Sequence, residues 1–169
     1  MKILVAGLGN PILGNDGVGW RVGQETERLF AELPRSEDAS QKVEFQYLSL
    51  GGLSLMEQLI GFDAAILIDA FAARSSPPGT IYCYPLEEIS EVSSGHLSGA
   101  HDTSLFKALQ LGKSLGAKIP DKIQIVGIET ETGLYFTEEL SPEIAAVVPE
   151  ASRVVLEQIH SFLRWEGKP

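Results

Sequence analysis

A glycine-rich segment near the start of the chain constrains its fold most. Residues 7–19 read GLGNPILGNDGVG, follow the apolar run at 3–6 and precede an amphipathic stretch. This succession predicts a buried strand, a tight loop and a helix. In open α/β folds that first loop lies at the carboxyl edge of the sheet, where such folds build their sites. Asp16, the first acidic residue of the chain, lies within the loop.

Segments typical of strands and of helices alternate along the rest of the chain. The patterns predict helices at 18–33, 53–60 and 103–115, and strands at 42–48, 64–68, 80–84 and 123–128. Residues 87–100 are polar and predict a long loop. Ser141 and Pro142 indicate the start of a last helix, and Pro149 predicts a break or kink after its second turn.

This order predicts an α/β fold, a single three-layer domain spanning residues 1–169. Parallel strands joined by helices need right-handed crossovers and helices on both faces, so we expect a twisted, mostly parallel five-stranded sheet. The turn at 75–79 is too short for a helical crossover, so the strand at 80–84 is expected to be an antiparallel edge strand. If the first three strands are ordered 2-1-3, the first and third are neighbours at the switch point, where a crevice opens.

Charge and composition exclude several classes of protein. The 169 residues carry a formal net charge of −10, which opposes sequence-independent nucleic-acid binding. A single cysteine, Cys83, excludes an internal disulfide and a thiolate-rich zinc site. The chain starts directly with a strand and has no apolar run of membrane-spanning length, so we expect a cytoplasmic protein with no membrane partner. Nothing predicts an obligate interface, and a monomer is expected.

Asp16, Asp69 and His101 are the candidates for chemistry. Asp16 follows the first strand, Asp69 ends the third, and His101 precedes the helix expected at 103–115. Together they form an oxygen and nitrogen donor set able to hold nickel or zinc with positions open for substrate. Each has a plainer alternative: Asp16 as a helix cap, Asp69 as a turn acceptor, and His101 as a solvated side chain for which His96 competes.

Other candidates are weaker. The segment at 7–12 lacks the third glycine of a dinucleotide fingerprint, and the chain has no Gly-x-Ser-x-Gly elbow. Cys83 within a strand is interpreted as a small buried apolar residue rather than a nucleophile. Glu129, at the end of the strand at 123–128, is a candidate general base because it also lies at the carboxyl edge.

At these residues the chain resembles the hydrogenase maturation endopeptidases, nickel-dependent proteases that trim [NiFe] hydrogenase large subunits. Five motifs carry the resemblance in the family's order: GLGN with DGVG, then IDA, PGT, HDTSL, and VGIE followed by LSPEI. They begin at residues 7, 16, 68, 78, 101, 126 and 140, so the resemblance covers nearly the whole chain.

The resemblance implies an endopeptidase that removes a short C-terminal peptide from a [NiFe] hydrogenase large-subunit precursor after nickel insertion. It assigns metal binding and catalysis to Asp16, Asp69 and His101, and favours His101 over His96. The implied metal is Ni²⁺ carried by the substrate, with Zn²⁺ or Cd²⁺ as substitutes in vitro. The sequence leaves open whether nickel is a catalyst or a recognition mark.

One departure concerns substrate recognition. The family carries a polar Asp-Gly-Gly-Thr segment after the second strand, and here residues 50–53 read LGGL. Gly51 and Gly52 are retained, and glycine at both positions suggests a close approach of backbone to substrate. The identity of the large subunit is therefore less determined than the chemistry.

Two rival interpretations remain at this level. A chaperone or scaffold would bind a metalloenzyme precursor without cutting it, although the retained Asp16, Asp69 and His101 oppose this. The residues GLGNP also resemble the start of peptidyl-tRNA hydrolases, but that family's further motifs are absent and the net charge opposes a tRNA partner.

Overall fold

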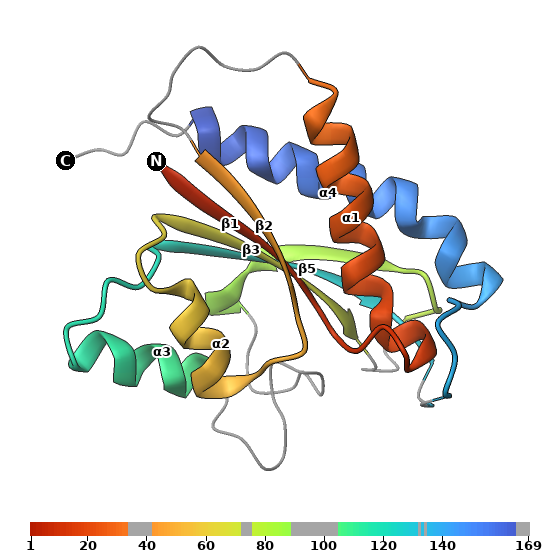
Figure 1. Cartoon of the computed structure of the whole chain (residues 1–169), viewed down its shortest axis with the longest axis horizontal. Coiled ribbons are helices and arrows are strands. Elements are labelled where there is room, and N and C mark those ends of the chain that lie inside the picture. The colour runs from red at the N-terminus through yellow and green to blue at the C-terminus, as the bar shows by residue number, and fades with distance from the viewer. Residues whose placement is uncertain (34–41, 72–75, 89–104, 132, 134, 165–169) are drawn as a thin grey trace.

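A five-stranded sheet forms the centre of the molecule (Figure 1). The computed structural model describes residues 1–33, 42–71, 76–88, 105–131, 133 and 135–164. The strands are β1 (Lys2–Leu8), β2 (Lys42–Leu48), β3 (Ala64–Phe71), β4 (Ile81–Pro85) and β5 (Lys122–Glu129). Their order is β2-β1-β3-β5-β4, and only the β4–β5 pair is antiparallel. The first three strands take the 2-1-3 order, which is the condition for a crevice between the first and third, and the predicted antiparallel edge strand is confirmed.

Helices cover both faces of the sheet, as expected from the buried strands. Helices α1 (Val18–Ala31) and α4 (Pro142–Arg164) lie on one face, and α2 (Gly52–Leu59) and α3 (Leu105–Ser114) lie on the other (Figure 1). Two short 3₁₀ turns, η1 (Gly14–Gly17) and η2 (Leu86–Glu88), complete the described elements. No helix among these residues has the length and apolar character that a membrane crossing requires.

Alternation along β3 divides its side chains between two cores. Ile66 and Ile68 pack with α1 and α4, whereas Ala65, Leu67 and Phe71 pack with α2 and α3. All eight β3 residues are buried, which explains why the strand reads as a continuous apolar run with one carboxylate.

Two glycines let the start of α1 sit directly on the sheet. A Cβ at Gly19 would lie 2.3 Å from the Leu8 carbonyl oxygen and 2.4 Å from that of Ile68. A Cβ at Gly7 would lie 2.5 Å from the Gly19 carbonyl oxygen. The glycine pattern at 7–19 is therefore a packing requirement that brings β1, β3 and α1 together at the carboxyl edge.

Of the break or kink predicted at Pro149, the break is wrong, because α4 runs without interruption for 23 residues, and the kink stays a prediction. Proline has no amide hydrogen to donate to the Ala145 carbonyl, which removes one helical hydrogen bond. The helix nevertheless continues because its apolar side chains are buried against the sheet on both sides of Pro149, among them Ile144, Ala151 and Val155. Tertiary packing outweighs the local penalty here.

Candidate active site

The carboxyl ends of β1 and β3 bring the two predicted aspartates to one edge of the sheet. These strands are parallel neighbours, with Gly7 in register with Ile68. Asp69 is the residue after Ile68, and Asp16 lies in η1, within the loop that leaves β1. The crevice expected between the first and third strands is thus the place where both carboxylates arise.

Asp69 is fully buried, with 0% of its surface exposed. Its position on β3 alternates with that of Ile68 and matches those of Leu67 and Phe71, so it belongs to the face that α2 and α3 cover. Its Oδ1 accepts a hydrogen bond from the Ala70 amide at 2.9 Å. Burial of a carboxylate costs desolvation free energy, and packing of a strand end does not require a charged side chain. The burial of Asp69 therefore favours a functional role.

Asp16 is half-buried and held by the loop that precedes it. The Asn10 amide donates a hydrogen bond to its Oδ2 at 2.7 Å. Gly9 has a φ of +114°, and a Cβ there would lie 1.9 Å from the Asp16 carbonyl oxygen. The alternative of a helix cap is wrong, because the N-cap residue of α1 is Gly17 and not Asp16. The loop therefore positions Asp16 for something other than helix capping.

The third predicted ligand, His101, lies outside the described residues, as does the competing His96. Within the described part of the chain no three His, Cys, Asp or Glu side chains gather closely enough to hold a metal ion. The segment at 89–104 leads into α3, which belongs to the same face as Asp69. The three-residue ligand set remains a prediction.

Glu129 belongs to the same face of the sheet as Asp69 and is almost completely buried, with 1% exposed. The register pairs Asp69 with Gly127 and Phe71 with Glu129, which separates the two carboxylate-bearing positions by about 8 Å from standard strand spacings. The Tyr82 hydroxyl donates a hydrogen bond to Glu129 Oε2 at 3.2 Å. The place of Glu129 at the end of its strand predicts a candidate base, and the structure adds its burial and its tyrosine partner.

Aromatic side chains form one wall beside these carboxylates. The Phe71 ring lies over Gly127, because a Cβ there would be 2.7 Å from that ring. Phe71 also stacks with Tyr82 at a centroid distance of 6.0 Å and an interplanar angle of 27°. The Phe71 ring thus crosses the line between the positions of Asp69 and Glu129. Tyr82 contacts both the Phe71 ring and the Glu129 carboxylate. The sequence pattern gives no signal for this wall, because Phe71 and Tyr82 come from two different strands, β3 and β4.

Gly51 and Gly52 lie where α2 begins, after β2. Gly51 is the N-cap of α2 and Gly52 has a φ of +52°, a conformation that favours glycine. The Gly9 amide donates to the Leu48 carbonyl at 3.1 Å, and the Ser49 hydroxyl donates to the Gly9 carbonyl at 2.8 Å. These bonds attach the segment before Gly51 to the loop of Asp16, so both glycines lie at the same sheet edge.

Cys83 differs from the sequence interpretation, because its side chain is exposed rather than buried. It pairs in register with Val126, whose side chain packs with α1 and α4, so it belongs to the face opposite Asp69. Partial burial raises the pKa of the Cys83 thiol, and the nearby Glu157 carboxylate on α4 raises it further, against a hydrogen bond from Gln124 that lowers it. A raised pKa disfavours the thiolate, so Cys83 is poorly suited to be a nucleophile.

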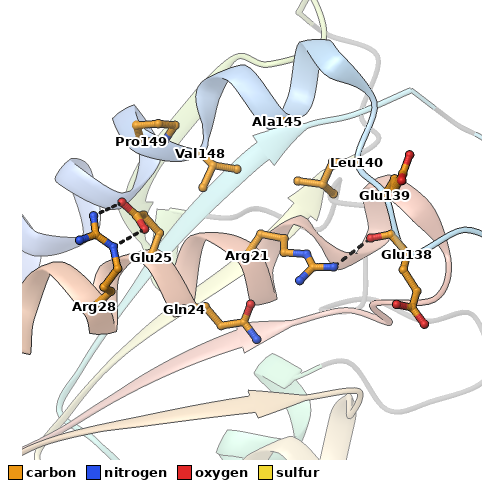
Figure 2. Close-up of a pocket in the computed structure, with 10 residues that line it drawn as sticks. All are labelled: Arg21, Gln24, Glu25, Arg28, Glu138, Glu139, Leu140, Ala145, Val148 and Pro149. Atoms are coloured by element: carbon orange, nitrogen blue, oxygen red, sulfur yellow. Dashed lines mark hydrogen bonds and ion pairs between the residues drawn. The ribbon is translucent and has the colours of Figure 1, made fainter.

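A surface groove of about 770 Å³ lies between α1 and α4, on the other side of the sheet from Asp69. Figure 2 shows Arg21 reaching the Glu138 carbonyl, at 2.9 Å, and Arg28 paired with Glu25. The residues lining the groove include neither Asp16 nor Asp69. The groove is therefore separate from the candidate active site.

Comparisons with known proteins agree with this architecture. The sequence profile of the hydrogenase maturation protease family (HycI) matches residues 28–158. The hydrogenase 2 maturation protease of Escherichia coli K12 is 28% identical over 167 residues, covering 99% of this chain and 93% of that protein.

Solved structures show the same fold. The hydrogenase maturating endopeptidase HybD from E. coli superposes with a TM-score of 0.72 at 22% identity, covering 95% of this chain and 93% of that one. A hydrogenase 2 maturation peptidase from Thaumarchaeota archaeon SCGC_AB-539-E09 superposes with a TM-score of 0.61 at 26% identity, covering 94% and 98%. At 22% identity, the similarity to HybD from E. coli concerns the fold alone.

Proposed function

Since this chain belongs to the hydrogenase maturation protease family, we propose that it cuts a hydrogenase large-subunit precursor once near its C-terminus, using Asp16, Asp69 and His101. One observation supports the site assignment: the neighbouring parallel strands β1 and β3 place Asp16 and the fully buried Asp69 at one edge of the sheet. The family favours a peptidase over the rival scaffold and over a peptidyl-tRNA hydrolase.

The donor set suits a metal ion that is bound through oxygen and nitrogen. Asp16 and Asp69 offer carboxylates, His101 would offer an imidazole, and the one cysteine belongs to the opposite face. Such a set fits Ni²⁺, with Zn²⁺ or Cd²⁺ as substitutes, but does not bind nickel as strongly as thiolates would. When bound, the metal would polarise the scissile carbonyl or lower the pKa of a water molecule.

We propose that nickel arrives with the precursor and that this chain's residues complete or probe its coordination. Gly51 and Gly52 are the proposed points of close backbone approach by the substrate, and Leu50 and Leu53 flank them in place of polar side chains. One chain provides both described carboxylates, so a monomer is the proposed active unit. We place its action in the cytoplasm, where a precursor would be matured before use.

The direct test is intact-mass analysis of a nickel-loaded large-subunit precursor from the same source. Incubation with this protein is expected to remove one C-terminal peptide, and only when the precursor contains nickel. A precursor prepared without nickel is the matched control. A precursor mass that stays unchanged in both samples would contradict the proposed activity and favour the scaffold.

Glu129 is the proposed acceptor for the proton that an attacking water must lose. Replacing Glu129 with glutamine keeps an oxygen that can accept from the Tyr82 hydroxyl but removes the basic group. We expect kcat to fall by about 10²- to 10⁴-fold, the range typical of a lost general base. Glu150→Gln, on the exposed surface of α4, is the control. Turnover of Glu129→Gln equal to that of the control would assign Glu129 a purely structural role.

A further inference from the structure

Two consecutive aromatic side chains stand in solvent at the carboxyl edge of the sheet. Tyr135 is 74% exposed and Phe136 is 89% exposed. Ile12, in the loop between β1 and η1, is 47% exposed. Large apolar side chains gathered on a surface are typical of an interaction site, whereas single ones are ordinary. We call these three residues the aromatic lip.

Backbone hydrogen bonds attach the segment that carries the aromatics to the loop of Asp16. Leu13 and Thr137 form a parallel β-bridge. The Gly14 amide donates to the Thr137 carbonyl at 2.8 Å, and the Thr137 amide donates to the Ile12 carbonyl at 3.1 Å. These bonds join the two halves of the aromatic lip, because Ile12 precedes one partner and Phe136 precedes the other.

Further bonds fix the end of the same segment. The Ser141 amide donates to Asn15 Oδ1 at 2.8 Å, and Asn15 is the residue before Asp16. Arg21 donates to the Glu138 carbonyl at 2.9 Å (Figure 2). The segment is therefore held by hydrogen bonds at Thr137, Glu138 and Ser141, directly after the two aromatic residues. A surface organised in this way loses little entropy when a partner binds.

The chemistry of the surroundings indicates the partner. The lip is bonded through its backbone to the loop that carries Asp16, so it lies at the same edge of the sheet as this candidate ligand. Exposed Glu138 and Glu139 follow Phe136 after Thr137, in a chain with a net charge of −10. An apolar surface with an acidic border is complementary to an apolar surface bordered by lysine or arginine.

We propose that Ile12, Tyr135 and Phe136 form the docking surface for the body of the hydrogenase large-subunit precursor, beside its scissile segment. This inference rests on the proposed function and adds the surface that recognises the substrate. The partner surface is apolar with a basic border. Rigid aromatic residues commonly provide most of the binding energy at such interfaces.

The test is a double substitution, Tyr135→Ser with Phe136→Ser, assayed with nickel-loaded precursor. We expect KM for cleavage, and Kd for the precursor by biolayer interferometry, to rise tenfold or more. We expect kcat at saturating precursor to change less than twofold, because neither side chain belongs to the donor set. The melting temperature should stay unchanged, since both side chains are exposed.

The matched control is Leu115→Ser. Leu115 is 76% exposed and lies between α3 and β5, at the amino edge of the sheet. It should leave KM and Kd at their original values. If the original protein cleaves normally while the double variant keeps the same KM and Kd, the docking surface is overturned and the proposed function stands. If the original protein neither binds nor cleaves the precursor, both fall.

Discussion

Replacing Asp16 with asparagine is expected to reduce cleavage of the precursor about a thousandfold, through loss of roughly 4 kcal/mol of transition-state stabilisation. The substitution removes the negative charge that a metal ligand needs. In the original protein the Asn10 amide donates a hydrogen bond to Asp16 Oδ2 at 2.7 Å. The asparagine keeps an oxygen that can accept this hydrogen bond, so the loop should persist. Intact-mass measurement of product against time gives the rate, and circular dichroism checks the fold.

Asp121→Asn is the matched control for this experiment. Asp121 is exposed and precedes β5 at the amino edge of the sheet, far from the loop of Asp16. Its turnover should equal that of the original protein. His101→Ala tests the third proposed ligand in the same assay and is expected to be as inactive as Asp16→Asn. Near-normal turnover in both of these variants would refute the proposed ligand set.

Gly9→Ala is expected to lower the free energy of unfolding by about 3 kcal/mol or more. Two effects add. An alanine is strained at a φ of +114°, and its Cβ would lie 1.9 Å from the Asp16 carbonyl oxygen, so backbone must move. For a chain of this size the melting temperature should fall by roughly 6 to 12 °C. Thermal unfolding followed by circular dichroism measures it.

Gly61→Ala separates the two effects. Gly61 also has a positive φ, +88°, but no atom lies within 4 Å of a Cβ built there. This variant should lose only the conformational part, about 1 kcal/mol. Equal losses of melting temperature in the two variants would show that the close approach to Asp16 contributes nothing. Because Gly9 supports the loop of Asp16, we also expect slower cleavage for Gly9→Ala alone.

Local patterns predicted most of the fold, and they failed where tertiary contacts outweighed them. Proline chemistry correctly indicates a lost hydrogen bond at Pro149, but burial of α4 against the sheet keeps the helix continuous. The β-strand pattern around Cys83 correctly predicts a strand, but not which side chains an edge strand leaves exposed. Both errors concern the surroundings of a residue, which short-range periodicity does not describe.

The sequence by itself determined the α/β architecture, the antiparallel edge strand and the places of Asp16 and Asp69 after the first strand and at the end of the third. Periodicity, glycine sterics and right-handed crossovers are local rules, and together they leave few arrangements. Only the tertiary structure decided that Asp69 and Glu129 share a face with Phe71 between them, and that Ser141 bonds to Asn15, 126 residues away. Such contacts depend on how distant segments pack, and no short-range pattern encodes them.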